Sequence, residues 1–269
     1  MKHHLSIKHT LILAAKSQSN EDTYHTQMLP IRGKPAIAWV IESIEDKQHI
    51  VVVLNQDNQK VEKYLQSKYP FVQIVKTPFD NQKTQQLSIL SSLQTGVDAL
   101  NAQEDGVLQV ILGDTLCQFD ALESKRDFIV VSPDFKDAKR WCLVDMDEQH
   151  HAKAFYDKKN VSPEHKKAVV GVYQFSDLPC LRQSLENALD ASATELSDVL
   201  LRYGLNHPLT CVEARTWFDF GHKSGIIKAQ THFYNARDFN TLSVDSVRGV
   251  LTKSSSKIQK LEDEYLWYT

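Results

Sequence analysis

The sequence predicts an α/β fold: a doubly wound, mostly parallel sheet to which an antiparallel part is added. As far as Asp114, apolar runs of strand length alternate with segments of helical periodicity, which is typical of β-α-β units with right-handed crossovers. After Asp114, short polar turns join the apolar runs and leave no room for helices between most of them, which indicates antiparallel pairing. We therefore expect a Rossmann-like domain at residues 8–234 and a shorter appendage at residues 235–269.

The parallel half should contain alternating strands and helices. The expected strands are the apolar runs at residues 9–15, 49–54, 71–75 and 107–112. Apolar residues at helical spacing predict helices over 36–44, 58–69 and 84–100. Two prolines and a glycine in residues 28–35 predict a turn. Pro35 suits a helix start because its missing N–H would lack an intrahelical partner there anyway.

The second half should contain more strands than helices. The expected strands are residues 128–132, 141–145, 152–156, 168–175 and 209–213. One helix is expected over 178–189 and another from 224 to 234. A further helix should open within 194–198, with Thr194 as its N-cap because a threonine hydroxyl can accept a free backbone N–H there.

Composition and charge exclude several classes of partner. The net charge is −3 and the lysines and arginines are scattered, so no basic stripe could track a nucleic acid. No apolar run approaches the ~18 residues of a membrane span and no signal peptide precedes the first strand, so we expect a cytoplasmic protein. The cysteines are far apart and form no CxxC pair, which predicts buried thiols: Cys117, Cys142, Cys180 and Cys211.

Asp114 follows the glycine at the end of the expected strand 107–112. In open α/β sheets the ligand crevice lies outside the carboxyl ends of the strands, so a carboxylate there can reach a bound metal or phosphate. For a Gly-Asp pair taken by itself, an ordinary turn aspartate is the more frequent interpretation. Both interpretations stand until the rest of the chain is considered.

Six segments, in this order, resemble the sugar-phosphate nucleotidyltransferases, which include the nucleotide-sugar pyrophosphorylases of capsule and surface polysaccharide synthesis. They are Leu-Ile-Leu-Ala-Ala at 11–15, Met-Leu-Pro-Ile-Arg-Gly-Lys-Pro at 28–35, Leu-Gly-Asp at 112–114, Gly-Val-Tyr at 171–173, Glu-Leu-Ser-Asp at 195–198 and Trp-Phe-Asp-Phe-Gly at 217–221. The resemblance spans residues 8 to 234 and implies the nucleotide-diphospho-sugar transferase type of fold. It also implies the reaction: a sugar phosphate or other small phosphorylated metabolite attacks the α-phosphorus of a nucleoside triphosphate, and pyrophosphate leaves.

This chemistry accounts for the residue types. A displacement at phosphorus between two anions needs positioning and charge neutralisation, and Mg²⁺ supplies both while taking only one or two carboxylates. The resemblance implies that Asp114 and Asp219 hold the Mg²⁺ and are catalytic, with Lys16 as a further catalytic cation facing the triphosphate. Taken alone, Asp219 would equally be a turn aspartate with Trp217 and Phe218 in the core.

The resemblance also implies substrate contacts. Glu195 would bind sugar hydroxyls, Lys158 would neutralise the sugar phosphate, and Gly171 would let the backbone approach the sugar. Residues 84–86 fall where the family reads the nucleobase, and the substrate-binding set is completed by Gly113, Ala14, Ala15 and Gln86. Two bland alternatives stay open: Glu195 would also favour a helix N-terminus, and Lys158 would also suit a solvated surface.

The first loop departs from the family. Its Gly-x-Gly-Thr-Arg stretch wraps and neutralises the triphosphate, but residues 15–23 read Ala-Lys-Ser-Gln-Ser-Asn-Glu-Asp-Thr, and His25 and Thr26 replace the Pro-Lys that follows. Losing three contacts at ~2.7–4 kcal/mol per preorganised donor would cost several kcal/mol of transition-state stabilisation. The sequence therefore leaves open a second function: a catalytically silent regulatory or scaffolding module that binds nucleotide or sugar phosphate.

A third interpretation is a transferase of the related nucleotide-sugar-using fold. Such an enzyme would need an Asp-x-Asp at a strand end. The candidate is Asp145-Met-Asp147, which the pattern places in a turn between antiparallel strands.

The tail carries a separate resemblance. Residues 238–245, 249–254 and 257–267 resemble the opening hairpin, strand and helix of a kinase-like small-molecule phosphotransferase, with Lys253 on the strand. This implies a fused or partner phosphotransferase domain, and the alternative is a hairpin and helix that dock on the main domain. The sequence leaves a homo-oligomer open.

Overall fold

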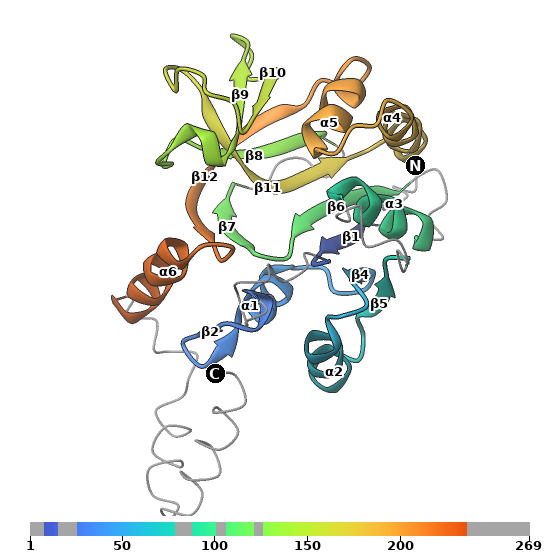
Figure 1. The fold of residues 1–269 in the computed structure, drawn as a ribbon, viewed down its shortest axis with the longest axis vertical. Helices are drawn as coiled ribbons and strands as arrows, with labels where there is room; N and C mark the ends of the chain where they lie inside the picture. The colour runs from blue at the N-terminus through green and yellow to red at the C-terminus, as the bar shows by residue number, and fades with distance from the viewer. Residues whose placement is uncertain (1–7, 16–25, 79–87, 101–105, 121–125, 236–269) are drawn as a thin grey trace, which may run out of the picture.

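The computed structural model describes residues 8–15, 26–78, 88–100, 106–120 and 126–235. In this part of the chain one large sheet runs in the order β5-β4-β1-β6-β11-β8-β12-β7, with β9 beside β11 and β10 beside β9 (Figure 1). Helices pack on both faces, α3, α4 and α5 on one and α1 and α2 on the other. The α/β class and the doubly wound arrangement that the sequence predicts are confirmed.

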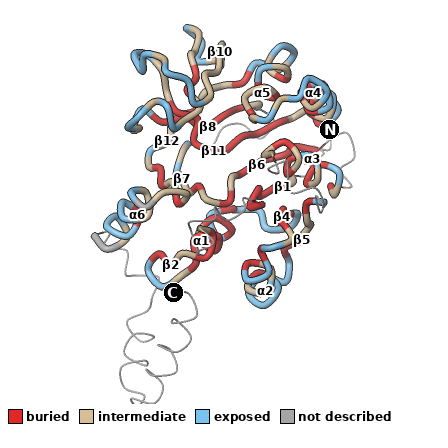
Figure 2. Tube along the Cα trace, viewed as in Figure 1, coloured by how far each residue is buried: buried red, intermediate tan, exposed pale blue. Residues whose placement is uncertain are grey.

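The parallel half consists of four strands that pair with one another in parallel. They are β1 (Lys8–Leu13), β4 (Ile50–Leu54), β5 (Gln73–Lys76) and β6 (Val107–Leu112). The helices of this half are α1 (Ala36–Ser43), α2 (Gln59–Lys68) and α3 (Ile89–Ala99). All five residues of β4 are buried because helices cover both of its faces (Figure 2).

Before α1 the chain makes a short turn. The 3-10 helix η1 (Thr26–Met28) precedes the two-residue strands β2 (Pro30–Ile31) and β3 (Lys34–Pro35). The turn between the strands places Arg32 and Gly33 at positive φ, which glycine adopts readily and other residues rarely do. Pro35 is the N-cap of α1, so the predicted turn and helix start are both confirmed.

The second half is the predicted antiparallel addition. Its strands are β7 (Thr115–Phe119), β8 (Phe128–Ser132), β9 (Cys142–Met146), β10 (Ala152–Asp157), β11 (Lys167–Phe175) and β12 (Thr210–Asp219). Strand β11 runs antiparallel to β6, β8 and β9, and therefore joins the two halves. Strand β12 changes partner along its length, pairing in parallel with β8 up to Glu213 and antiparallel with β7 from Ala214 onward.

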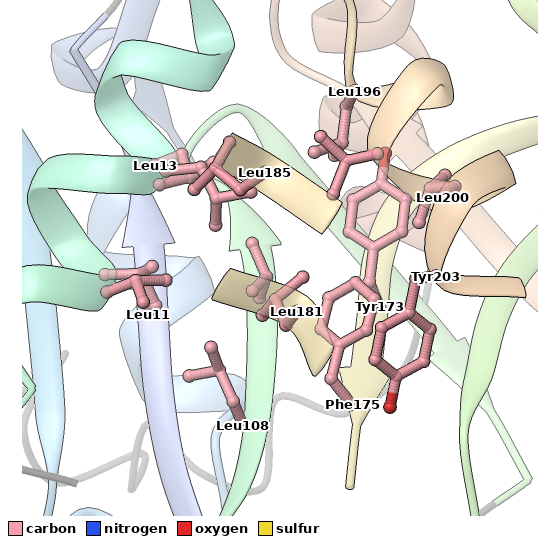
Figure 3. Packing of buried hydrophobic residues seen from close by; sticks show 14 of the residues in the cluster. Leu11, Leu13, Leu108, Tyr173, Phe175, Leu181, Leu185, Leu196, Leu200 and Tyr203 are labelled. Carbon is pink, nitrogen blue, oxygen red and sulfur yellow. The ribbon is translucent and has the colours of Figure 1, made fainter. Parts of the chain in front are cut away.

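The helices of the second half cover one face and one edge of the sheet. They are α4 (Leu178–Asp190), α5 (Leu196–Gly204) and α6 (Lys223–Asn235), and the short 3-10 helix η2 (Ala138–Arg140) precedes β9. Leucines of α4 and α5 pack on Tyr173 and Phe175 of β11, in a core cluster that also contains residues of β1, α3 and β6 (Figure 3). Burying one such side chain stabilises the fold by about 1.5–3 kcal/mol, so this cluster holds the two halves of the sheet and their helices together.

Several predicted boundaries were wrong for local reasons. The helix expected over 84–100 begins at Ile89, because Ser88 is an extended N-cap that accepts the backbone N–H of Ser91; residues 84–87 lie outside the described part. The N-cap of α5 is Glu195 and not Thr194. Strand β7 was not predicted, and β12 continues through the Trp-Phe-Asp motif instead of ending at residue 213.

The remaining whole-chain predictions have mixed outcomes. The four cysteines are free and partly buried, and burial raises the pKa of Cys117 to about 12 and that of Cys211 to about 12. No helix within the described ranges combines the length and the apolar character that a membrane crossing requires. The described residues end at Asn235, so the rest of the predicted appendage, residues 236–269, lies outside them.

Candidate active site

Two aspartates from different strands face one small space. Asp114 lies in the turn between β6 and β7, and Asp219 ends β12 directly opposite Thr115. A Cβ added to Gly221 would lie 2.8 Å from Oδ2 of Asp114 and 3.0 Å from Oδ1 of Asp219. The two carboxylates therefore converge on a space that is kept open because residue 221 has no side chain.

Asp219 is held from two sides. Its Oδ1 accepts the backbone N–H of Gly221 at 2.9 Å, and its Oδ2 lies 3.5 Å from Nδ1 of His222. The ring of His222 stacks on Trp141, which also packs edge-on against Trp217. The sequence reasoning missed His222 and Trp141. His222 stood directly after the Trp-Phe-Asp-Phe-Gly motif, whereas nothing local marked Trp141.

The pair of carboxylates fits a hard cation that shares its ligands with a substrate. Within the described residues, no group of three or more His, Cys, Asp or Glu side chains is arranged to hold a metal ion. A closed protein cage is therefore not built here. Mg²⁺ does not need one, because it takes one or two carboxylates together with phosphate oxygens and water. Asp114 and Asp219 thus fit Mg²⁺, as the sequence predicts.

Lys158 and Glu195 form an ion pair. Nζ of Lys158 donates to Oε1 of Glu195 at 2.9 Å, and Oδ1 of Asp157 lies 3.8 Å from the same nitrogen. Glu195 is the N-cap residue of α5, where its charge also favours the helix N-terminus, but its side chain makes no capping bond to the helix. The structure therefore brings together the two residues that were predicted to bind the sugar phosphate.

Burial and neighbouring charges shift the pKa values of groups around this pair. Burial raises the pKa of Asp157, and the negative charge of Glu195 is the second cause. Burial alone would lower the pKa of Lys158, but the hydrogen bond to Glu195 and the nearby negative charges, Glu195 first, together outweigh it and the pKa is raised. Burial also raises the pKa of Tyr173, followed by the charges of Cys142, Asp157 and Asp114. Tyr173 thus lies within electrostatic reach of both Asp157 and Asp114.

Gly171 lies in β11 at the seam between the two halves. Its φ is +96°, and an added Cβ would lie 2.7 Å from Cδ1 of Leu112 and 3.1 Å from Oγ1 of Thr115. Thr115 Oγ1 in turn donates to the carbonyl oxygen of Val170 at 2.9 Å. Packing against the end of β6 therefore requires glycine here, and its contact with a sugar stays a prediction.

The remaining predicted contacts lie at the end of β1 or outside the described part. Ala14 and Ala15 are buried directly after β1. Gly113 packs against Ala14, since an added Cβ would lie 2.6 Å from Cβ of Ala14. Lys16 and Gln86 lie outside the described residues.

The two aspartates of the Asp145-Met-Asp147 segment form contacts within and next to the β9–β10 hairpin. Oδ2 of Asp145 accepts the hydroxyl of Tyr156 at 2.9 Å, and Oδ1 of Asp145 lies 3.2 Å from Nζ of Lys166. Asp147 accepts the backbone N–H of His151 at 2.8 Å within the turn between β9 and β10. Both carboxylates are therefore engaged in holding β9 against β10, and nothing here favours the third interpretation.

The fold is a doubly wound α/β sheet with two carboxylates close together at the ends of its strands. A family model described as nucleotidyl transferase matches residues 21–235. The chain therefore belongs to the nucleotidyl transferase family. This confirms the resemblance that the six ordered segments carry, while the comparison with curated proteins found no matching relative.

Solved structures share the fold at low sequence identity. A UDP-glucose pyrophosphorylase from Acinetobacter baumannii superposes with a TM-score of 0.62 at 17% identity, covering 88% of this chain and 98% of its own. A structure from Bacillus anthracis, described as a putative glucose-1-phosphate thymidylyltransferase, gives a TM-score of 0.65 at 16% identity, with 85% of this chain and 96% of that chain covered. HddC from Yersinia pseudotuberculosis, complexed with GMP-PN, gives 0.59 at 18% identity, with 84% and 99% covered.

Proposed function

We propose that the chain is a Mg²⁺-dependent nucleotidyltransferase that joins a nucleoside monophosphate, taken from the triphosphate, to a sugar phosphate or other small phosphorylated metabolite. The observation that carries this proposal is the convergence of Asp114 and Asp219 on Gly221. Family membership supports nucleotidyl transfer. Two structural neighbours, described as a UDP-glucose pyrophosphorylase and a putative glucose-1-phosphate thymidylyltransferase, favour a sugar phosphate as the acceptor, the molecule that receives the nucleotide.

Asp114 and Asp219 would hold the metal ion at the carboxyl ends of β6 and β12. When bound, Mg²⁺ neutralises phosphate oxygens and helps to orient them. The protein's own contribution is to keep Asp219 oriented, because the N–H of Gly221 fixes one carboxylate oxygen and His222 lies against the other. A carboxylate that is already oriented needs no rearrangement when the charges develop.

Lys158 and Glu195 would hold the acceptor. An ammonium group has three N–H donors, and Lys158 directs one at Glu195, which leaves the others for the acceptor phosphate. Glu195 keeps further lone pairs for acceptor hydroxyls. In the reaction, an oxygen of the acceptor phosphate forms a bond to the α-phosphorus. The bond from that phosphorus to the bridging oxygen breaks, and its electron pair leaves with pyrophosphate.

The decisive experiment measures pyrophosphate release from ATP, CTP, GTP and UTP with a panel of sugar phosphates and phosphocholine. We expect release with at least one pair, and loss of release with EDTA. Gly221→Ala should reduce turnover by a factor on the order of 10²–10³, the cost of losing one preorganised group, because its methyl group occupies the space between the carboxylates. Gly204→Ala is the matched control, since the nearest atom to its Cβ lies 4.0 Å away. No release with any pair, and no Mg²⁺-dependent nucleotide binding, would refute the proposal.

A second function is favoured by the sequence of the first loop. Residues 16–23 contain no glycine or arginine and include two acids, which disfavours a triphosphate. A catalytically silent module that binds nucleotide or sugar phosphate would bind these ligands in calorimetry but release no pyrophosphate. The same ligand panel therefore separates the two functions.

We also propose that the chain acts in cell-surface polysaccharide synthesis beside a fused or partner phosphotransferase domain. Both parts rest on the sequence resemblances alone. Deletion of the gene should change the composition of the surface polysaccharide, and the acceptor found in the release assay should be a product of the phosphotransferase. An unchanged surface, or an acceptor that no phosphotransferase supplies, would refute this setting.

A further inference from the structure

Three side-chain amides converge on two consecutive carbonyl oxygens at the end of β1. Nδ2 of Asn58 donates to the carbonyl oxygen of Ala14 at 2.9 Å, and Nε2 of Gln27 donates to the same oxygen at 3.3 Å. Nδ2 of Asn55 donates to the carbonyl oxygen of Ala15 at 3.1 Å. We call Gln27, Asn55 and Asn58 the amide clamp.

The members of the amide clamp come from separate parts of the fold. Gln27 belongs to η1, Asn55 directly follows β4, and Asn58 is the N-cap of α2. Their exposed fractions are 2%, 3% and 0% respectively. Burying an amide is unfavourable unless it is hydrogen-bonded. The three buried amides therefore depend on the carbonyl oxygens of this two-residue segment, and they hold its backbone in place.

The side chain of Asn58 bonds to Ala14 and does not cap its own helix. An N-cap asparagine ordinarily uses Oδ1 to accept a backbone N–H of the first turn, which stabilises the helix by about 1 kcal/mol. Asn58 makes no such bond, and its Oδ1 has no hydrogen-bond partner among the residues described. The amide of Asn58 is therefore oriented by Ala14 and not by its own helix: Nδ2 pairs with that carbonyl while Oδ1 stays unpaired among the described residues.

The amide clamp fixes the direction of a backbone donor. In a planar trans peptide the carbonyl and the following N–H point in opposite directions. Holding the carbonyl of Ala14 against Gln27 and Asn58 thus directs the N–H of Ala15 away from them. This segment packs against Gly113, the neighbour of Asp114, so the donor lies at the same edge of the sheet as the proposed metal site.

We propose that the amide clamp positions the backbone of Ala14 and Ala15 for the nucleotide, with the N–H of Ala15 as a phosphate donor. Gln27, Asn55 and Asn58 are positioning residues and need not touch the ligand. They take over, from outside the loop, part of the role that a glycine-rich first loop has in the family. The inference rests on the proposed function only in requiring that the protein bind a nucleoside triphosphate.

The test is calorimetric binding of ATP, CTP, GTP and UTP with Mg²⁺ to the full chain and to the near-isosteric variants Asn58→Asp, Asn55→Asp and Gln27→Glu. Each variant turns a donor into an oxygen that repels the carbonyl. We expect the Kd for the bound triphosphate to rise at least tenfold, with the KM of the acceptor unchanged. Gln27→Glu perturbs the longest of the three bonds, which makes it the variant best suited to remain folded.

Gln174→Glu is the matched control. Gln174 is also buried, at 3% exposed, and its Nε2 donates to the carbonyl oxygen of Arg126 at 2.9 Å, near the far end of β11. This variant should lose stability as the clamp variants do and keep its Kd. Asn58→Asp should also regain affinity at acidic pH, where a protonated carboxyl donates to Ala14, whereas Asn58→Ala should not.

Two outcomes would overturn the inference. In the first, the wild-type chain binds a triphosphate and all three clamp variants bind it equally well, or Gln174→Glu weakens it as much as they do. In the second, the wild-type chain binds none of the four triphosphates, which removes the proposed function together with the clamp. The two failures are distinguished by the wild-type titration alone.

Discussion

The backbone N–H of Phe220 donates a 2.7 Å hydrogen bond to the carbonyl oxygen of Asp114. The residue after Asp219 is thereby tied to the residue that bears the other carboxylate. This link runs through the main chain, so either side chain can be changed while the strands stay in register.

We accordingly predict that Asp114→Asn and Asp219→Asn abolish turnover without unfolding the protein. The loss should be on the order of 10²–10³ or more, because each change removes a preorganised charge from the phosphate site. In Asp219→Asn the amide oxygen can still accept the N–H of Gly221. The free energy of unfolding in urea should therefore change by less than ~1 kcal/mol. Turnover near the wild-type rate in either variant would show that the metal assignment is wrong.

Lys158→Met should selectively weaken binding of the acceptor. A hydrogen bond to a charged group is worth about 1.5–3 kcal/mol, so the KM of the acceptor should rise about tenfold or more while that of the triphosphate stays the same. Stability should hardly change, because the Lys158 side chain is 60% exposed and exposed ion pairs contribute little. Initial-rate kinetics with each substrate varied in turn measure both constants.

The control for Lys158→Met is Lys167→Met. Lys167 forms a comparable pair with Glu213, linking β11 to β12, and it is not among the predicted substrate residues. Its loss should leave both KM values unchanged. An equal rise in acceptor KM for the two variants would mean that Lys158 acts only through general surface charge.

Gly171→Ala should destabilise the fold. A φ of +96° is strained for any residue with a Cβ, and the new methyl group would overlap Leu112. Strain of this kind costs on the order of 1–3 kcal/mol, which urea denaturation resolves easily. Gly204→Ala has open space around it and should stay within about 0.5 kcal/mol of the wild type. Equal stabilities for the two variants would disprove the packing explanation of Gly171.

Asp157→Asn should stabilise the protein at neutral pH. Burial, and after it the charge of Glu195, raises the pKa of Asp157 above its ordinary value of 3.8, so the folded state binds this proton more tightly than the unfolded state does. Its stabilising contribution is complete below that ordinary value and is lost as the pH rises through the raised pKa. The advantage of the uncharged asparagine should therefore be present at pH 7 and fade on acidification.

Urea denaturation over a pH series tests this dependence. Asp120→Asn is the control, because the Asp120 side chain is 70% exposed and its pairing with Arg215 lies at the surface. That change should have little effect on stability at neutral pH. A variant at Asp157 that is no more stable than the wild type at pH 7 would contradict the assigned burial.

The sequence predicted most of the fold because its strands are apolar runs of ordinary length and its helices have clear periodicity. Strand β7 escaped because Thr115 to Phe119 is only partly buried and includes an exposed glutamine, so no clean alternation marks it. Strand β12 was cut short because Glu213 to Arg215 interrupt its apolar character. Those residues sit where the strand passes from β8 to β7, a change of partner that is not local information.

The site was predictable where motifs carry it and not where tertiary contacts do. Asp114, Asp219, Lys158 and Glu195 were found by resemblance, and the structure brings them into two pairs. Glu195 was misplaced within its helix because the threonine one residue earlier is the better N-cap by propensity. The amide clamp had no local signal, since asparagines after a strand usually indicate a turn.

The partner change of β12 has a consequence for how this protein could diverge over evolutionary time. Side chains on a strand alternate between faces, so inserting or deleting one residue in β12 would carry Asp219 to the opposite side of the sheet. Substitutions along the strand leave that geometry alone, and the irregularity between Ala214 and Thr216 is already built into the pairing. We would therefore expect descendants of this gene to keep the length of β12 even where its exposed residues vary.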